Sequence, residues 1–312
     1  MTFHRLDYDI HPHEKYFQTT LCNRIERAGV GIHSGTNSVV HLSPAPANSG
    51  IRFKVGSTEF AASHENVLHT DRATCIGVDG VYLSTVEHIL SALNGLNVTN
   101  ALIEVQGSEL PILDGSAGPW VEAIMESGIC QYEITSKLIR LAETVVLKRG
   151  DSYLVATPAE EFSLTCITHF DHPMLGTQVE TVYDDAETYR TQIAPARTFG
   201  FQEEVEKLLS QGLALGGNFD NALIVYQDRF SSDLRVRNEC LHHKILDLFG
   251  DLSLAGGRII ASITAIRPGH KINTEFAGLL AKNALPSISE FEMPLDREQE
   301  VTDTQGVLHA GY

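Results

Sequence analysis

The order in which strand-like and helix-like segments follow one another constrains the fold of this chain most strongly. Alternating apolar residues predict strands at 38–44, 50–55 and 100–106, and apolar residues at helical spacing predict helices at 84–96 and 118–127. A second series follows in similar order, with strands at 138–149, 152–158, 162–170, 221–227 and 258–266 and helices at 201–212, 240–252 and 273–285. Intermixed strands and helices of this kind predict an α+β protein.

The two series share local features that suggest an internal duplication. In each, a strand runs into a Pro-Ala turn, and a later helix carries a His shortly before Ile-Leu. We therefore expect two α+β halves, 17–133 and 134–289, each of a size typical of domains. The ends, 1–16 and the acidic 290–312, lack apolar periodicity and are expected to be loose. A site made by both halves would lie between them.

Composition limits what such a protein can bind. The chain is 43% hydrophobic and can bury a core, and its formal charge of -17 argues against a general binder of nucleic acid or anionic membranes. No run approaches the ~18 apolar residues of a membrane span, and the first residues lack the apolar stretch of a signal peptide. We therefore expect a cytoplasmic protein, monomeric and without stable membrane insertion.

The cysteines also limit the kind of metal site. Five cysteines are scattered along the chain and form no CxxC pair, so the sequence indicates neither a disulfide framework nor a thiolate zinc site. A metal ion, if bound, would be held by His and carboxylate.

One candidate site lies on the helix predicted at 240–252. His243 and Asp247 are four residues apart, so both side chains lie on one helix face, within reach of a single metal ion. For this pair alone, a surface hydrogen bond between the two side chains is the more ordinary interpretation.

A second candidate is the pair Glu87 and His88 near the start of the helix predicted at 84–96. Ser84 followed by Glu87 fits a capping box, in which the carboxylate would only satisfy the first amides of the helix. Alternatively, His88 supplies a third metal ligand and Glu87 a base beside it, as metal-assisted hydrolysis requires. Both interpretations remain open on this pattern.

A third candidate is His270, which follows the strand predicted at 258–266. A lone His on a turn is usually solvated. Asp251 lies one helical turn beyond Asp247 and could keep His270 protonated, because a neighbouring carboxylate raises the pKa of imidazole. His270 could then act as a general acid.

Together these pieces resemble the family of UDP-3-O-acyl-N-acetylglucosamine deacetylases, the zinc-dependent amidohydrolases of lipid A biosynthesis. The resemblance covers about residues 18–285 and rests on GVGIHSG, STVEHILSALNGL, ELPILDGSAGPWV, FDHPMLG, ARTFGF, GLALGG with FDNA, HHKILDLFGDL and GH-IN. It implies two α+β halves whose helices pack between two sheets, each half with an insert. It also implies zinc at the junction and a UDP-linked, acylated amino sugar as substrate.

Residue by residue, the resemblance implies a ligand set and a mechanism. The zinc ligands would be His88, His243 and Asp247, which leaves a fourth position for water. Glu87 would be the general base.

The remaining catalytic roles also come from the resemblance. Thr198 and Lys244 would stabilise the charge that develops on the acetyl oxygen. His270, held cationic by Asp251, would protonate the leaving amine.

The segment from 198 to 224 resembles the insert that forms a hydrophobic passage for the acyl chain. The substrate-contacting residues implied there are Phe199, Val205, Ala214 and Gly217, together with Lys244. An amphipathic helix packed on a hairpin would give the same pattern.

Some positions depart from the family pattern. His242 stands where Arg is usual, Lys271 where a small residue is usual, and Gln202 is polar near the passage. Two alternatives follow: a zinc deacetylase for another N-acetylated amino sugar or nucleotide sugar, and a non-catalytic sugar-nucleotide or lipid-binding paralogue. The second is disfavoured because a binder needs neither the acid nor the base.

Overall fold

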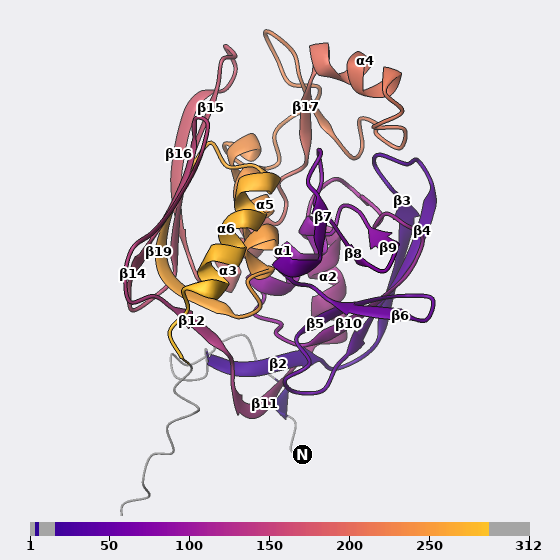
Figure 1. Ribbon diagram of the computed structural model, residues 1–312. Coiled ribbons are helices and arrows are strands. Elements are labelled where there is room, and N and C mark those ends of the chain that lie inside the picture. Colours follow the sequence, from indigo (N-terminus) through magenta and orange to yellow (C-terminus); the bar gives the residue numbers. More distant parts are fainter. Residues whose placement is uncertain (1–3, 6–15, 287–312) are drawn as a thin grey trace, which may run out of the picture.

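The computed structural model describes residues 4–5 and 16–286, and most of the two ends expected to be loose lies outside these residues (Figure 1). In the described part, two sheets face each other and helices fill the space between them (Figure 1). The chain is an α+β protein, as predicted.

The first sheet has five strands in the order β3-β4-β10-β5-β6. Alternate residues of its strands point to the helices and are buried, including Val40, Leu42, Phe53 and Ile103. Its strands are β3 (Ile25–Val30), β4 (Asn37–Pro44), β5 (Ile51–Val55), β6 (Thr58–Ala61) and β10 (Ala101–Gln106).

The second sheet has the order β13-β14-β19-β15-β16, with a sixth strand, β12, paired with β19. Leu154, Leu164, Cys166 and Ile263 are fully buried on its inner face. Its strands are β12 (Leu138–Arg140), β13 (Val145–Arg149), β14 (Ser152–Pro158), β15 (Ser163–Phe170), β16 (Gly176–Tyr183) and β19 (Arg258–Ile266).

The two sheets repeat one topology strand for strand. In the first, β10 pairs antiparallel with β4 and parallel with β5; in the second, β19 pairs antiparallel with β14 and parallel with β15. A helix precedes and a helix follows each of these central strands. The shared topology confirms the duplication that the sequence suggested.

Four helices lie between the sheets: α1 (Glu87–Gly95), α2 (Gly118–Ser127), α5 (Glu239–Ser253) and α6 (His270–Lys282). The start of α1 crosses α5 closely at Gly250, where an added Cβ would lie 2.1 Å from the carbonyl oxygen of Glu87. Only glycine permits this approach. None of the helices in the described residues is long and apolar enough to cross a membrane.

Each half carries an insert between its last hairpin and the helix that precedes the central strand. The first insert contains a 3-10 turn (His64–Asn66) and the small sheet of β7 (Val67–His69), β8 (Cys75–Val78) and β9 (Val81–Leu83). The second contains α3 (Ala186–Thr188), a π-helical turn (Tyr189–Ile193), β17 (Phe199–Phe201), α4 (Gln202–Ser210) and β18 (Leu223–Val225).

A third, small sheet joins the N-terminal strand to the segment between the halves. Its order is β1 (His4–Arg5), β11 (Ile129–Thr135) and β2 (Phe17–Leu21). The pairing of β2 with β11 brings Cys22 and Cys130 together as a disulfide, with Cα atoms 5.2 Å apart. The expectation that no disulfide forms was wrong, because the two cysteines are 108 residues apart and only the folded sheet makes them neighbours.

Candidate active site

Three ligand-type side chains meet at the junction of the halves. His88 comes from the first turn of α1, and His243 and Asp247 come from successive turns of α5. One donor atom from each lies within 4.8 Å of the others, and all three residues are buried. The interpretation of His243 and Asp247 as a surface pair is wrong, since each is only 2% exposed.

The chemistry of this donor set fits a metal cation. Asp247 Oδ1 is buried without a hydrogen-bond donor in the described residues and lies 3.5 Å from His243 Nε2. Burial and the adjacent His243 lower the pKa of His88 to about 3, and burial lowers the pKa of His243, so both imidazoles are neutral near pH 7. Burial opposes ionisation of Asp247, but Lys244 and His243 hold its pKa below the usual range. Two neutral imidazoles and one carboxylate form a set that zinc favours.

Glu87 lies beside this set and does not cap its helix. Helix α1 begins at Glu87, its N-cap is Val86, and no side chain caps it. The capping-box interpretation is therefore wrong. Glu87 Oε2 instead accepts a hydrogen bond of 3.0 Å from the backbone N–H of Thr74. Burial, aided by Asp251 and Asp247 and opposed by His270, raises the pKa of Glu87 to about 8.

His270 is the first residue of α6 and pairs with Asp251, as the sequence suggested. Its Nδ1 lies 2.9 Å from Asp251 Oδ2. Asp251 is fully buried and also accepts hydrogen bonds from Thr74 Oγ1 at 2.5 Å and Asn273 Nδ2 at 3.0 Å. Burial lowers the pKa of His270, but Asp251 and Asp247 outweigh it and raise that pKa to about 9. His270 is therefore a cation at neutral pH.

Thr74 was missed by the sequence reasoning. Its backbone N–H holds the carboxylate of Glu87, and its hydroxyl holds that of Asp251. It lies in the loop before β8, where no sequence pattern marks it.

Lys244 extends from α5 toward the same space. Its Nζ donates to Asp247 Oδ2 at 2.8 Å and lies 5.6 Å from the ring centre of Phe199. Burial lowers its pKa, but the nearby carboxylates, Asp247 first, raise it above the usual range. Lys244 therefore keeps a positive charge beside the ligand set.

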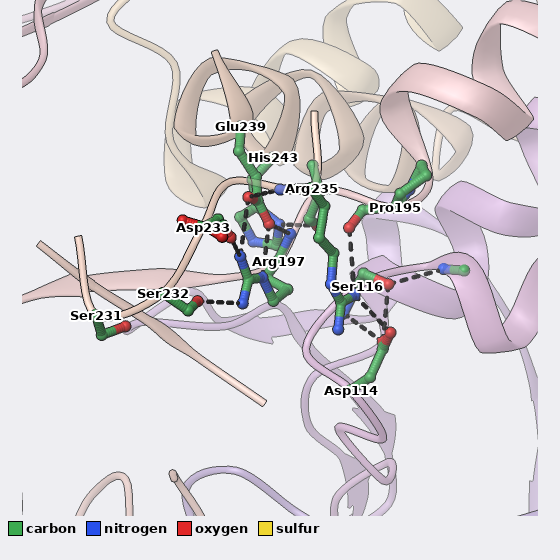
Figure 2. Close-up of polar contacts among 12 residues, drawn as sticks. Asp114, Ser116, Pro195, Arg197, Ser231, Ser232, Asp233, Arg235, Glu239 and His243 are labelled. Carbon is green, nitrogen blue, oxygen red and sulfur yellow. Dashed lines mark hydrogen bonds and ion pairs between the residues drawn. The ribbon is translucent and has the colours of Figure 1, made fainter. Parts of the chain in front are cut away.

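Thr198 belongs to a segment that contacts His243 directly. His243 Nδ1 donates to the carbonyl oxygen of Ala196 at 3.0 Å, so its Nε2 faces Asp247. Thr198, two residues later, is half-buried, and its backbone N–H donates to Gly115 O at 2.7 Å. Figure 2 shows Arg197 and Glu239 beside His243, in contacts that sequence reasoning also missed.

The GVGIHSG segment is held by a carboxylate that had no assigned role. Glu109 accepts hydrogen bonds from the backbone N–H groups of His33 at 2.9 Å and Ser34 at 2.7 Å. The same segment pairs with the second insert, because Gly216 N donates to Ile32 O at 3.0 Å. The segment between β3 and β4 of the first half is therefore in contact with the second insert.

The residues expected to line an acyl passage lie around α4. Val205, Ala214 and Phe199 are half-buried, and Gly217 is exposed. Phe199 packs edge-on against Phe170, with ring centres 5.6 Å apart.

The departures from the family pattern lie at different places. His242 points to the second sheet, where its Nε2 lies 2.9 Å from Glu180 Oε2 on β16. Lys271 and Gln202 are exposed. His242 is therefore paired with a carboxylate of this chain.

Buried His, His and Asp donors, with a carboxylate and a cationic His nearby, fit the class of metal-dependent hydrolases. Comparison with known proteins identifies the family. A profile of the UDP-3-O-acyl N-acetylglycosamine deacetylases (LpxC) matches residues 18–282. The chain belongs to this family of enzymes.

Individual relatives are similar in sequence to this chain over most of its length. The UDP-3-O-acyl-N-acetylglucosamine deacetylase of Syntrophus aciditrophicus is 41% identical over 83% of this chain and 84% of its own length. The enzyme of the same name from Syntrophotalea carbinolica is 37% identical over 86% of this chain and 89% of its own length. The enzyme from Geotalea uraniireducens is 35% identical over 89% of this chain and 93% of its own length.

Proposed function

We propose that this chain is a zinc-dependent deacetylase that hydrolyses the N-acetyl group of UDP-3-O-acyl-N-acetylglucosamine. The products would be acetate and the free amine, UDP-3-O-acyl-glucosamine, in the committed step of lipid A biosynthesis. The observation that carries the proposal is the buried cluster of His88, His243 and Asp247, with Glu87 and His270 close enough to act on its charges, in a member of this family.

The ligand set would hold zinc through His88, His243 Nε2 and Asp247. Zinc bound there would polarise the acetyl carbonyl and lower the pKa of the attacking water. Glu87 would take a proton from that water, which requires its ionised form. A positive charge beside Glu87 favours that form.

The remaining side chains would act on the developing charge and on the leaving group. The Thr198 hydroxyl and the Lys244 ammonium would stabilise negative charge on the acetyl oxygen. His270, cationic beside Asp251, would donate its Nε2 proton to the amine as the C–N bond breaks, because an unprotonated amine is a poor leaving group.

Substrate selection would depend on the second insert. The half-buried Phe199, Val205 and Ala214 would contact the acyl chain, with Gly217 leaving space beside them. Lys244, next to Phe199, would also contact the polar part of the substrate.

Acetate release tests this function. We expect turnover of UDP-3-O-acyl-N-acetylglucosamine, loss of turnover after chelation, and recovery when zinc is added back. Unacylated UDP-N-acetylglucosamine is the matched substrate and should be hydrolysed much more slowly. Equal turnover of both substrates would contradict the proposed specificity, and full activity in strong chelator would contradict the metal.

A further inference from the structure

A buried ion pair lies behind the candidate metal site and has no role in the proposed reaction. Arg197 Nε donates to Glu239 Oε1 at 2.7 Å, and Arg197 Nη2 donates to Oε2 at 3.1 Å. The backbone N–H of Arg197 donates to Oε1 at 3.0 Å. Glu239 is fully buried and Arg197 is 5% exposed. Charges at this depth are costly unless their hydrogen bonds are complete.

The surroundings complete these hydrogen bonds (Figure 2). Arg197 Nη1 donates to Ser232 Oγ at 2.8 Å, and Nη2 also donates to Asp233 O at 2.9 Å. The backbone N–H of Arg235 donates to Glu239 Oε2 at 2.8 Å. Each carboxylate oxygen of Glu239 therefore accepts two hydrogen bonds, and the guanidinium has one fixed orientation.

This pair connects the helix that carries a metal ligand to the segment that orients the same ligand. Glu239 is four residues before His243, one turn away on α5. Arg197 directly follows Ala196, whose carbonyl oxygen accepts from His243 Nδ1 at 3.0 Å. The residue after Arg197 is Thr198, the proposed oxyanion donor. A shift of Arg197 would therefore move two groups of the site.

A second arginine ties the same segment to the first half. Arg235 Nη1 donates to Asp114 Oδ2 at 2.6 Å and lies 3.4 Å from Pro195 O, as Figure 2 also shows. The backbone of Thr198 is joined to Gly115 by a hydrogen bond of 2.7 Å. The segment is thus held from both halves, but among residues 4–5 and 16–286 only Arg197 joins it to the helix of His243 by an ion pair.

We propose that Arg197 and Glu239 are positioning residues for the metal site. Their ion pair keeps the Ala196 carbonyl against His243 Nδ1, so that Nε2 is the nitrogen presented to Asp247 and the metal. The inference rests on the proposed function, because it concerns the metal proposed there.

The test is metal affinity in Arg197→Lys. Lysine keeps the positive charge but lacks the planar fork that contacts both carboxylate oxygens. We expect a folded protein whose Zn²⁺ affinity, measured by competition with a chelator, is weaker by about 10- to 100-fold. The visible absorption spectrum of the Co²⁺-loaded protein should also change, because the geometry around the ion changes.

The matched control is Arg258→Lys. Arg258 forms a largely buried ion pair with Asp184 and is the first residue of β19, at the end of that strand away from His270. This variant should lose thermal stability and keep the Zn²⁺ affinity and Co²⁺ spectrum of the wild type.

Two different results with the wild type and Arg197→Lys would overturn the inference. If the wild type binds neither Zn²⁺ nor Co²⁺, the proposed metal function fails and the inference fails with it. If the wild type binds both ions and Arg197→Lys loses stability with unchanged affinity and spectrum, the ion pair is merely structural.

A second variant covers the case in which Arg197→Lys does not fold. The double variant Arg197→Met with Glu239→Gln removes both charges and keeps an acceptor oxygen for the backbone N–H groups that Glu239 binds. We expect it to fold and still to bind Zn²⁺ more weakly than the wild type. Wild-type affinity in this variant would overturn the inference.

Discussion

The two halves share one strand order and yet bring different chemistry to the junction. In the first half, α1 has nine residues and contributes Glu87 and His88 from its first turn. In the second half, α5 has 15 residues and contributes His243, Lys244 and Asp247. The groups of α5 lie on two successive turns, whereas both groups of α1 lie on its first turn.

The site is asymmetric although the scaffold is duplicated, because equivalent positions in the two halves carry different residues. The residue before Ile-Leu is His88 in the first half and Lys244 in the second, so equivalent positions carry a ligand-type imidazole and a cation. The repeated topology supplies the interface between the halves. The proposed acid, base and ligands lie at positions where the two halves carry different residues.

The largest expected effect comes from removing one proton-transfer group from each half. Glu87→Ala and His270→Ala should each lower kcat by about 10²- to 10⁴-fold, the usual contribution of a positioned base or acid. Neither should lose metal, whereas His88→Ala should. Steady-state kinetics with elemental analysis checks this, and Glu65→Ala, an exposed glutamate of the first half, is the control. Full activity in Glu87→Ala would show that Glu87 is not the base.

The next effect concerns the contact between the halves. Gly250→Ala would place a Cβ 2.1 Å from the backbone oxygen of Glu87. A backbone atom, unlike the end of a side chain, cannot rotate away from this contact. We expect a loss of about 1–3 kcal/mol in unfolding free energy and about 10²-fold in kcat, because Glu87 is displaced. At an unobstructed helix position the same change would stabilise by about 1 kcal/mol.

Gly278→Ala in α6 is the control for this change, since its Cβ would meet only the side chain of His64, at 2.8 Å. Chemical denaturation and kinetics compare the two variants. A Gly250→Ala protein as stable and active as Gly278→Ala would show that the halves do not need this close approach.

A smaller effect is expected at Thr74. Thr74→Val removes the hydroxyl that holds Asp251 and keeps the backbone N–H that holds Glu87. A lost hydrogen bond to a charged group costs about 1.5–3 kcal/mol, so we expect reduced stability and about tenfold lower kcat.

Thr168→Val in the second half is the matched control for Thr74. The Thr168 hydroxyl is buried without a hydrogen-bond partner in the described residues, so its removal should be neutral or stabilising. Thermal melts and kinetics decide, and equal behaviour of the two variants would show that Thr74 does not order the site.

Much of the fold and the centre of the site was predictable because its signals are local or periodic. His243 and Asp247 share a helix face by spacing alone, and the repeated order of strands and helices predicted the duplicated sheets. The start of α1 was placed too early. Thr85 has φ +60°, outside the helical region, so Ser84 cannot cap the helix and Glu87 is free to face the site.

The supporting contacts were not predictable because they join residues that are distant in sequence. Thr74 is 13 residues from Glu87 and 177 from Asp251, and Arg197 is 42 from Glu239. No period or spacing marks such pairs. Thr74 and Asp251 become neighbours only when the two halves pack together, and the other two pairs only when their own half folds.

The smallest expected change is a shift of the pH profile in Asp251→Asn. The proposed mechanism requires Glu87 ionised and His270 protonated, so kcat/KM should be bell-shaped in pH, with an alkaline limb that reports loss of the His270 proton. Asp251 raises the pKa of His270, which is about 9 in the wild type. Without that negative charge the pKa falls, and the alkaline limb should move by about one unit or more toward neutral pH.

The acid limb should move in the same direction but less. Asp251 also raises the pKa of Glu87, for which burial is the larger cause, so its neutralisation lowers that pKa as well. Asp247 still raises the pKa of His270 in the variant, which limits the alkaline shift. Asp228→Asn, an exposed change in the same half, should leave both limbs in place. An alkaline limb that stays at its wild-type position in a well-folded Asp251→Asn protein would contradict the pairing of Asp251 with His270 as the source of the acid.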